Sequence, residues 1–191
     1  MVRENALSPS DFIWPVFVMD GKDAEDSVAS MPGVVRRTVD RVGKAAKEAY
    51  DLGIPAICIF PYTGMADRTE DCALAWSHDN IANQAIRAIK EAVPEMAVMT
   101  DIALDPYNIN GHDGFVENGQ IVNDRTVDAL VKMAITQAEC GADILGPSDM
   151  MDGRIGAIRA ALEGDNHQNV TILSYTAKYA SAFYGPFRDA V

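Results

Sequence analysis

A single lysine near the end of the chain, Lys178, has the surroundings of a reactive amine. It follows a short apolar run, Val170 to Leu173, and its neighbours in sequence are small or aromatic. No acidic residue stands within the four positions before it to form a helical ion pair. A lysine held among apolar groups loses hydration, which favours the neutral amine that attacks carbonyl carbons. The other interpretation is an ordinary lysine at the start of a helix, and the local pattern leaves both open.

Three aspartates follow a second apolar run at close spacing, namely Asp101, Asp105 and Asp113. Their carboxylates could bind a hard cation such as Mg²⁺ through oxygen. They could instead orient a substrate amine or the ammonium group of a lysine, or cap the turns of their own loop. The spacing alone does not choose among these roles. His112, the histidine beside Asp113, is more simply read as a solvated loop residue.

Polar residues also follow the remaining apolar runs. Ser148 and Asp149 come after residues 142–145, and Tyr184 and Arg188 lie in a segment with glycine and proline that suits a mobile lid. The sequence places no histidine base beside Ser148, so a hydrogen bond to a substrate or to Lys178 fits better than a nucleophilic role. An N-terminal helix cap is the alternative for this serine–aspartate pair. An arginine in a lid can hold a carboxylate through two hydrogen bonds.

Alternating apolar strands and amphipathic helices must position these residues. The predicted strands are 11–18, 54–60, 97–104, 142–145 and 170–173, and the predicted helices are 40–52, 80–93, 124–138 and 155–162. No hairpin signal, such as Asn-Gly between two alternating apolar runs, interrupts them, so we expect a parallel sheet with right-handed crossovers. Parallel strands end at one edge of their sheet, which would gather the lysine, acids, serine and arginine there.

Two architectures fit five such β/α units. One is part of a (β/α)₈ barrel, which needs eight units. The other is a doubly wound open sheet, but the glycine-rich phosphate fingerprint of such sheets does not follow the first strand. With no repeat, linker or low-complexity segment, we expect residues 1–191 to form one domain.

Composition restricts the class of partner. The chain has 16 basic and 28 acidic residues, a net charge of −12, which makes nucleic acid and anionic membranes unfavourable partners. No run of 18 apolar residues predicts a membrane span. The three cysteines, Cys58, Cys72 and Cys140, are too few and too widely spaced for a disulfide framework or a zinc knuckle. We therefore expect a protein of the reducing cytoplasm.

Five sequence blocks carry a resemblance to a known family. The sequence resembles the porphobilinogen synthase (delta-aminolevulinic acid dehydratase) family in the blocks SPSDFIWPVFV, SMPGVVRRT, DIALDPYNINGHDGF, GADILGPSDMMDGRIGAIR and SYTAKYASAFYGPFRDAV. They run through nearly the whole chain in the family's order, and the last two are long and specific. The resemblance implies a (β/α)₈ barrel and a lyase that condenses two 5-aminolevulinate molecules into porphobilinogen in tetrapyrrole (heme) biosynthesis.

The resemblance also implies roles for individual residues. Lys178 matches the first of the family's two Schiff-base lysines, with Asp101 near the substrate amine and Ser148 in the wall of the site. The remaining substrate-binding residues that we expect are Tyr184, Arg188, Asp105, Asp113 and Phe183. The family is typically a homo-octamer, so we expect a homo-oligomer.

The chain departs from the family pattern in two ways. Where many members have three zinc-binding cysteines, this chain has Ala103, Asp105 and Asp113, so it resembles the zinc-independent, aspartate-type branch. We expect no zinc in the active site, and the Mg²⁺ that some members of this branch use would bind residues beyond Val191.

We also expect truncation at both ends, with about five of the eight β/α units present. The second lysine would then lie after this chain, and the family's N-terminal arm before it. Two alternative functions follow from that expectation and from the lysine. One is a catalytically incomplete fragment with a role in assembly, and the other is a class I aldolase-like Schiff-base enzyme.

Overall fold

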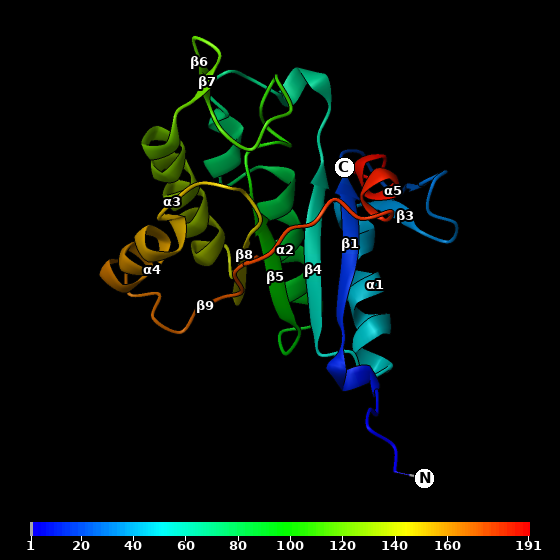
Figure 1. Cartoon of the computed structure of the whole chain (residues 1–191). Helices are drawn as coiled ribbons and strands as arrows, with labels where there is room; N and C mark the ends of the chain where they lie inside the picture. Colours follow the sequence, from blue (N-terminus) through cyan, green and yellow to red (C-terminus); the bar gives the residue numbers. More distant parts are fainter. Residues whose placement is uncertain (1) are drawn as a thin grey trace.

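A seven-stranded sheet forms the centre of the computed structural model, which describes residues 2–191 (Figure 1). The strands of this sheet are β1 (Ile13–Met19), β2 (Glu25–Ser27), β3 (Val35–Thr38), β4 (Ala56–Tyr62), β5 (Ala97–Ile102), β8 (Ile144–Pro147) and β9 (Thr171–Ile172). β4 is continuously buried over its first four residues, as its apolar run predicts for a strand covered on both faces.

The strand order decides between the two predicted architectures. In space the order is β2-β3-β1-β4-β5-β8-β9, so the parallel strands β1, β4, β5, β8 and β9 lie side by side in the order of the sequence. The short strand β3 is also parallel to β1 and lies on its other side. A doubly wound sheet reverses direction at a switch point, and the strands from β1 to β9 do not. The order is that of successive strands in a (β/α)₈ barrel.

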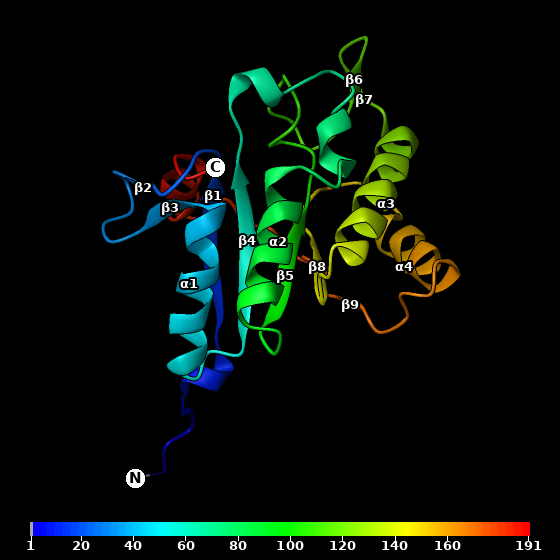
Figure 2. The ribbon, with the colours of Figure 1, turned by 180° about the vertical axis from the view of Figure 1, so that it is seen from behind.

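Four helices cover one face of the sheet, as Figure 2 shows from the helical side. They are α1 (Val39–Asp51), α2 (Ile81–Ala92), α3 (Asn123–Glu139) and α4 (Arg154–Gly164). The inward faces of α1 and α2 are predominantly alanine, valine and isoleucine, which allows close approach to the sheet. Gly53 follows α1 with a φ of +89°, a conformation that glycine adopts without strain, and Asn80 caps α2 by accepting a hydrogen bond from the Asn83 backbone at 2.8 Å. None of the helices in residues 2–191 is long and apolar enough to cross a bilayer.

The core consists of two groups of buried side chains. The larger lies between the sheet and α1–α4. All three cysteines are buried, and none forms a disulfide bond. We call the smaller group the C-terminal cluster. It comprises Phe17, Val28 and Ala190, with Met31, Val34, Phe60, Phe187 and Val191 packed against them. This cluster joins the first strands to the last described residues.

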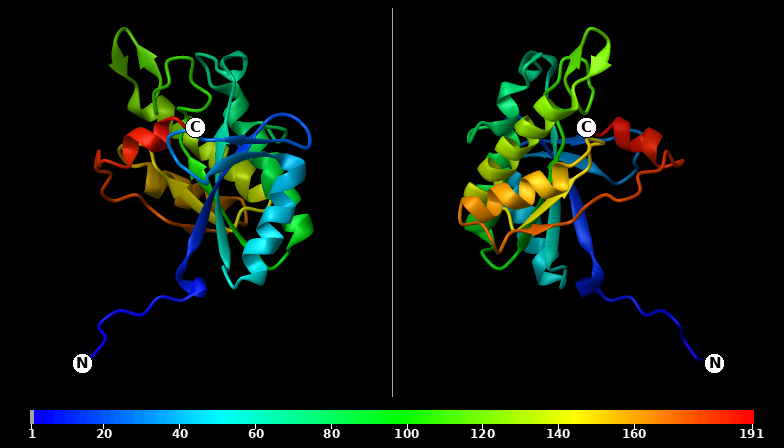
Figure 3. Two further views of the ribbon diagram at one scale, coloured as in Figure 1. Left: turned by 90° about the vertical axis from the view of Figure 1, so that its right-hand side faces the viewer. Right: turned by 60° about the vertical axis from the view of Figure 1, so that its left-hand side comes forward.

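The segment after β9 crosses the face of the sheet that the helices leave uncovered (Figure 3). Residues 173–183 are irregular, and the short helix α5 (Tyr184–Arg188) follows them near the C-terminal end of β1. Lys178 therefore does not open a helix, contrary to the alternative interpretation of the sequence. The predicted strand 170–173 is real but shorter, because only Thr171 and Ile172 pair with β8.

Two antiparallel hairpins contradict the expectation of a sheet without hairpins. β2 pairs with β3, and β6 (Val116–Glu117) pairs with β7 (Gln120–Ile121). The second turn contains Asn118-Gly119, both with positive φ, which is the hairpin signal that the short flanking strands concealed. Three short 3₁₀ helices complete the described elements: Pro9–Asp11, Met65–Asp67 and Ala73–Trp76.

The helix cap considered for Ser148 and Asp149 is wrong. The N-cap of α4 is Gly153, and Asp149 instead pairs with Arg154. The N-cap of α3 is Val122, and Thr126 lies inside that helix, where its hydroxyl donates to the Val122 carbonyl at 2.6 Å.

Candidate active site

A cavity of about 260 Å³ opens at the C-terminal ends of the strands. It is lined by Phe60, Asp101, Asp105, Asp113, Ser148, Tyr175, Lys178, Tyr184, Phe187, Arg188 and Val191. Seven of the eight predicted site residues are in this set. The parallel sheet explains their convergence, because β4, β5, β8 and β9 all end at this edge.

Lys178 projects its amine toward oxygen atoms. Its Nζ donates a hydrogen bond to the Ser148 backbone carbonyl at 2.7 Å and lies 3.6 Å from Oδ2 of Asp113. The lysine side chain is 40% exposed. The expectation of a lysine enclosed by apolar groups is therefore wrong. Its amine is accessible and is held in place by a carbonyl and a carboxylate.

The carboxyl group of Asp101 is strongly perturbed. Burial raises its pKa from 3.8 to about 7, while the Ser148 hydroxyl and the charge of Lys178 act in the opposite direction. Its Oδ1 atom is buried without a hydrogen-bond partner. Burial, and then the charge of Asp113, raise the pKa of Asp105 to about 6. Near neutral pH, Asp101 can therefore accept or release a proton next to the lysine.

The loop after β8 holds Ser148 in position. Its backbone N–H donates to the Ile102 carbonyl at 3.3 Å, which continues the pairing of β8 with β5. The next residue, Asp149, is buried, and one of its carboxylate oxygens lies 2.9 Å from Nε of Arg154. The other accepts a hydrogen bond from the Met151 backbone at 2.7 Å. These contacts fix the carbonyl that receives the lysine amine.

α5 contributes two aromatic side chains and an arginine to the cavity. Tyr184, Phe187 and Arg188 all line it, and the Arg188 guanidinium lies 5.9 Å from the centre of the Tyr184 ring. A neighbouring cavity of about 480 Å³ shares Asp105, Tyr184, Arg188 and Val191 with the first and adds Arg68. A ligand with a carboxylate would therefore meet arginine side chains where the two cavities adjoin.

The structure does not bring every predicted residue to the cavity. Phe183 is 84% exposed and does not line it, whereas Phe187, one helical turn later, does. His112 accepts a hydrogen bond from the Gly114 backbone at 3.0 Å and orders its own loop. His112 was predicted to be a solvated loop residue; it lies in the loop but is half-buried.

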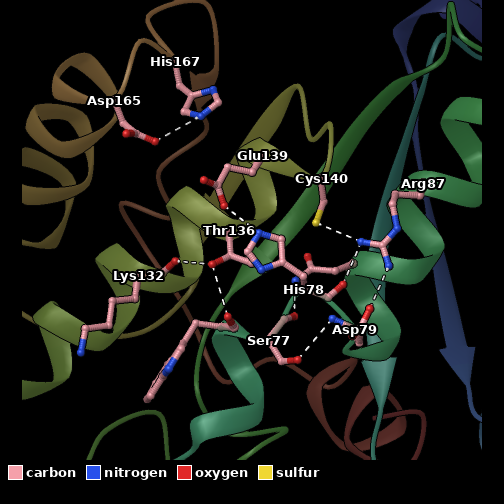
Figure 4. Close-up of polar contacts among 12 residues, drawn as sticks. Ser77, His78, Asp79, Arg87, Lys132, Thr136, Glu139, Cys140, Asp165 and His167 are labelled. Carbon is pink, nitrogen blue, oxygen red and sulfur yellow. Dashed lines mark hydrogen bonds and ion pairs between the residues drawn. The ribbon is translucent and has the colours of Figure 1, made fainter.

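The other two histidines form surface contacts among the helices (Figure 4). Nε2 of His78 lies 2.8 Å from Glu139, and Nε2 of His167 lies 3.5 Å from Asp165. Lys132 lies over the Trp76 ring at 5.5 Å. None of these three lines the cavity.

Four residues that line the cavity had no predicted role: Phe60, Tyr175, Phe187 and Val191. Phe60 and Tyr175 were detectable in principle, because each stands at or just beyond the end of a predicted strand. The positions of Phe187 and Val191 depend on how α5 packs against β1 and β4, which the local sequence does not show.

The donor atoms near β5 do not fit a thiolate zinc site. Ala103 offers no ligand atom and is buried, and Asp105 and Asp113 offer only hard oxygen atoms. Within residues 2–191, no group of three or more histidine, cysteine, aspartate or glutamate side chains is arranged to hold a metal ion.

The geometry of the site suits carbonyl chemistry. An accessible amine, a carboxyl group that titrates near neutrality and an arginine face one small cavity. A profile of the delta-aminolevulinic acid dehydratase family matches residues 1–191. The chain belongs to this family. This match favours the dehydratase family over the class I aldolase alternative.

Individual members of the family are closely similar to this chain. The delta-aminolevulinic acid dehydratase of Rhodobacter capsulatus is 59% identical over all 191 residues, and that of Bradyrhizobium diazoefficiens is 51% identical. The chain covers 58% and 54% of these two proteins, so it spans little more than half the length of these curated relatives.

A solved structure agrees over nearly the whole chain. It is the Toxoplasma gondii delta-aminolevulinic acid dehydratase in complex with its reaction product porphobilinogen, with a TM-score of 0.95 and 44% identity. The match covers 99% of this chain and 54% of that one. The fold is accordingly that of part of a (β/α)₈ barrel.

Proposed function

We propose that this protein is a porphobilinogen synthase in which Lys178 forms a Schiff base with 5-aminolevulinate. The observation that carries the proposal is the position of the lysine amine, 2.7 Å from the Ser148 carbonyl and 3.6 Å from Asp113, in a cavity that also contains Asp101 and Arg188. Membership of the family supports it.

The residues of the cavity account for Schiff-base formation. The neutral amine of Lys178 attacks the ketone carbon of 5-aminolevulinate, and a nitrogen–carbon bond forms. The former ketone oxygen takes up protons and leaves as water, which produces an iminium ion. Asp101, with a pKa of about 7, is suited to supply and recover these protons. Arg188 is placed to bind the substrate carboxylate.

The iminium ion then stabilises the negative charge that develops at the adjacent carbon. A second 5-aminolevulinate reacts with this first one, and the condensation releases two waters and porphobilinogen. Holding one molecule covalently raises its effective concentration toward the other. The whole reaction is proposed for the protein, and the residues described here serve the first substrate.

Borohydride trapping tests the proposal. The chain is incubated with 5-aminolevulinate, reduced with borohydride, and mapped by mass spectrometry. We expect one reduced adduct on Lys178, none in Lys178→Met, and full labelling in Lys132→Met, which removes a lysine outside the cavity. A folded chain without the adduct would overturn the proposal. Labelling by a sugar phosphate and not by 5-aminolevulinate would instead indicate aldolase chemistry.

We further propose that the active site works without zinc. The side chains available to bind a metal support this proposal: Ala103 has no ligand atom, and Asp105 and Asp113 offer carboxylates in place of the thiolates that zinc favours. We expect a zinc chelator to leave the extent of Lys178 labelling and the formation of porphobilinogen unchanged. Loss of activity on zinc removal, restored by added zinc, would contradict this. Mg²⁺, if required, would bind outside the residues described here.

We infer a cytoplasmic homo-oligomer, an octamer by resemblance to the family. The three cysteines are buried and form no disulfide bond, which is compatible with a reducing compartment. Light scattering of the purified protein measures the assembly, and a monomer at all concentrations would contradict it.

A further inference from the structure

Arg36 lies outside the cavity but contacts the helix that lines it. It belongs to β3, opposite Phe17 of β1, and only 8% of the residue is exposed. A guanidinium group withdrawn from water is destabilising unless its donors are paired. The partners of this arginine therefore show what its burial achieves.

The partners of Arg36 are the backbone carbonyls just after α5. Its Nε donates to the Ala190 carbonyl at 2.9 Å, and a terminal amino group donates to the Asp189 carbonyl. The other amino group donates to Asp26 of β2 at 2.7 Å, and the Tyr62 ring lies 4.2 Å from the guanidinium carbon. Carbonyls at and just beyond the C-cap of a helix lack partners within it, and the fork of donors on one arginine satisfies these two.

Other contacts hold the same helix on the same surface. The Phe187 ring lies 5.8 Å from that of Phe17 and 5.2 Å from that of Phe60. The hydroxyl of Ser30, six residues before Arg36, donates to the Pro186 carbonyl at 3.2 Å. We call this surface, formed by Phe17, Ser30, Arg36 and Phe60, the α5 dock.

The dock is needed because the preceding chain gives α5 little support. Residues 173–183 form neither helix nor strand, and Tyr179 and Phe183 are each 84% exposed. α5 itself has only five residues, too few for an isolated helix to be stable in water. Its position, and with it that of Arg188, is therefore determined mainly by contacts with the dock.

We propose that Arg36 is a positioning residue for substrate binding, which acts by holding α5 so that Arg188 faces the carboxylate of the ligand bound at Lys178. This inference rests on the proposed Schiff-base function. It predicts that loss of Arg36 weakens recognition of the carboxylate and leaves the reactivity of the lysine intact.

Trapping with two ligands separates these effects. The full chain is titrated with 5-aminolevulinate or with its methyl ester, which keeps the ketone and lacks the negative charge, and each sample is reduced with borohydride. In the parent chain we expect half-maximal labelling of Lys178 at a lower concentration of the acid than of the ester. In Arg36→Gln the concentration of the acid that gives half-maximal labelling should rise by about tenfold, the change that corresponds to one lost charge-assisted contact. The corresponding concentration of the ester should stay unchanged.

Arg37→Gln is the matched control. Arg37 is the next residue on the same strand, but its charged group pairs with Glu25 at 3.2 Å and faces the Trp14 ring, so its polar contacts are not with the carbonyls of α5. It should leave both titrations unchanged. Arg36→Lys, which keeps the charge without the fork of donors, gives a milder variant if Arg36→Gln unfolds. It should also raise the concentration of the acid that gives half-maximal labelling.

A double variant tests whether the effect passes through Arg188. When Arg36→Gln is combined with Arg188→Gln, the concentration of the acid that gives half-maximal labelling should be no higher than in Arg188→Gln alone. Retention of the parent's acid preference in folded Arg36→Gln or Arg36→Lys would overturn the inference while the Schiff-base function stands. Absence of any Lys178 adduct in the parent would overturn both.

Discussion

At the residue scale, Asp101 couples the site to the stability of the fold. Its pKa is raised from 3.8 to about 7 because burial disfavours the charged form. Between these two values the folded chain binds more protons at this residue than the unfolded chain does. The free energy of unfolding therefore falls as pH rises through that range. Asp105, raised to about 6, contributes in the same direction.

Asp101→Asn should remove the part of this pH-dependent loss of stability that comes from Asp101. At pH 8 we expect the variant to unfold with a free energy about 1–2 kcal/mol higher than that of the parent, which is less than the raised pKa alone implies because the residue is only half-buried. At pH 4 the difference should vanish, since the parent carboxyl is then protonated in the fold. Urea denaturation at the two pH values measures it. A difference of the same size at both would show that charge is not the cause.

At the scale of elements, β8 depends on a residue without a side chain. Gly146 lies opposite Asp101 of β5, and a Cβ atom there would come 2.5 Å from Met99 Cε, 3.3 Å from the Thr100 carbonyl and 3.4 Å from the Tyr175 ring. The glycine leaves space for Tyr175 to pack against the strand beside the acids. Tyr175 is one of the residues that line the cavity.

Two glycine-to-alanine substitutions should have opposite effects. Gly146→Ala should lower the free energy of unfolding by about 1–3 kcal/mol, because neighbouring side chains and the β5 backbone must shift. Gly156→Ala, within α4 and with open space around the new methyl group, should raise it by about 0.5–1 kcal/mol. Urea unfolding measures both changes. Equal losses would refute the close-contact explanation for Gly146.

The accuracy of the sequence predictions also varied by element. The parallel strands were predictable because each is an apolar run followed by polar residues, as in residues 54–60 and 97–104. β2 was not, because Glu25, Asp26 and Ser27 have no apolar pattern and pair through the backbone with β3. Lys178, Asp101 and Ser148 were found because strand ends converge. Phe183 was misplaced because an irregular segment has no period that shows which side chain turns inward.

At the scale of the whole molecule, the C-terminal cluster connects residues far apart in the chain. Phe17 and Phe187 pack together although β1 is the first strand and α5 the last helix. From the sequence alone, the basic pair Arg36-Arg37 is interpreted as a solvated loop, but Arg36 is buried. The reason is the same, since the two carbonyls that it binds after α5 lie more than 150 residues away. Such contacts become visible only once the path of residues 173–183 across the sheet is known.

Phe187→Ala should loosen the end of the chain without unfolding the rest. Its ring packs in the C-terminal cluster and not in the larger core, so the loss should be confined to α5 and its surroundings. We expect amide hydrogen exchange of residues 184–190 to accelerate by at least roughly tenfold, with exchange in α1–α4 unchanged. Phe183→Ala, at an exposed neighbouring site, should change neither. Uniform acceleration throughout the chain would show that the cluster belongs to a single cooperative unit.

The contact between Arg36 and Ala190 also has a consequence for biosynthesis. The two residues are separated by 154 positions, so at about 5–20 residues per second the ribosome adds the second roughly 8–30 s after the first. During that interval β3 is available to pair, but Asp189 and Ala190, whose carbonyls accept hydrogen bonds from Arg36, have not yet been synthesised. If Arg36 positions Arg188 as proposed, recognition of the substrate carboxylate cannot be complete before Ala190 has been added. A nascent chain that contains Lys178 but not yet Ala190 would then lack this recognition.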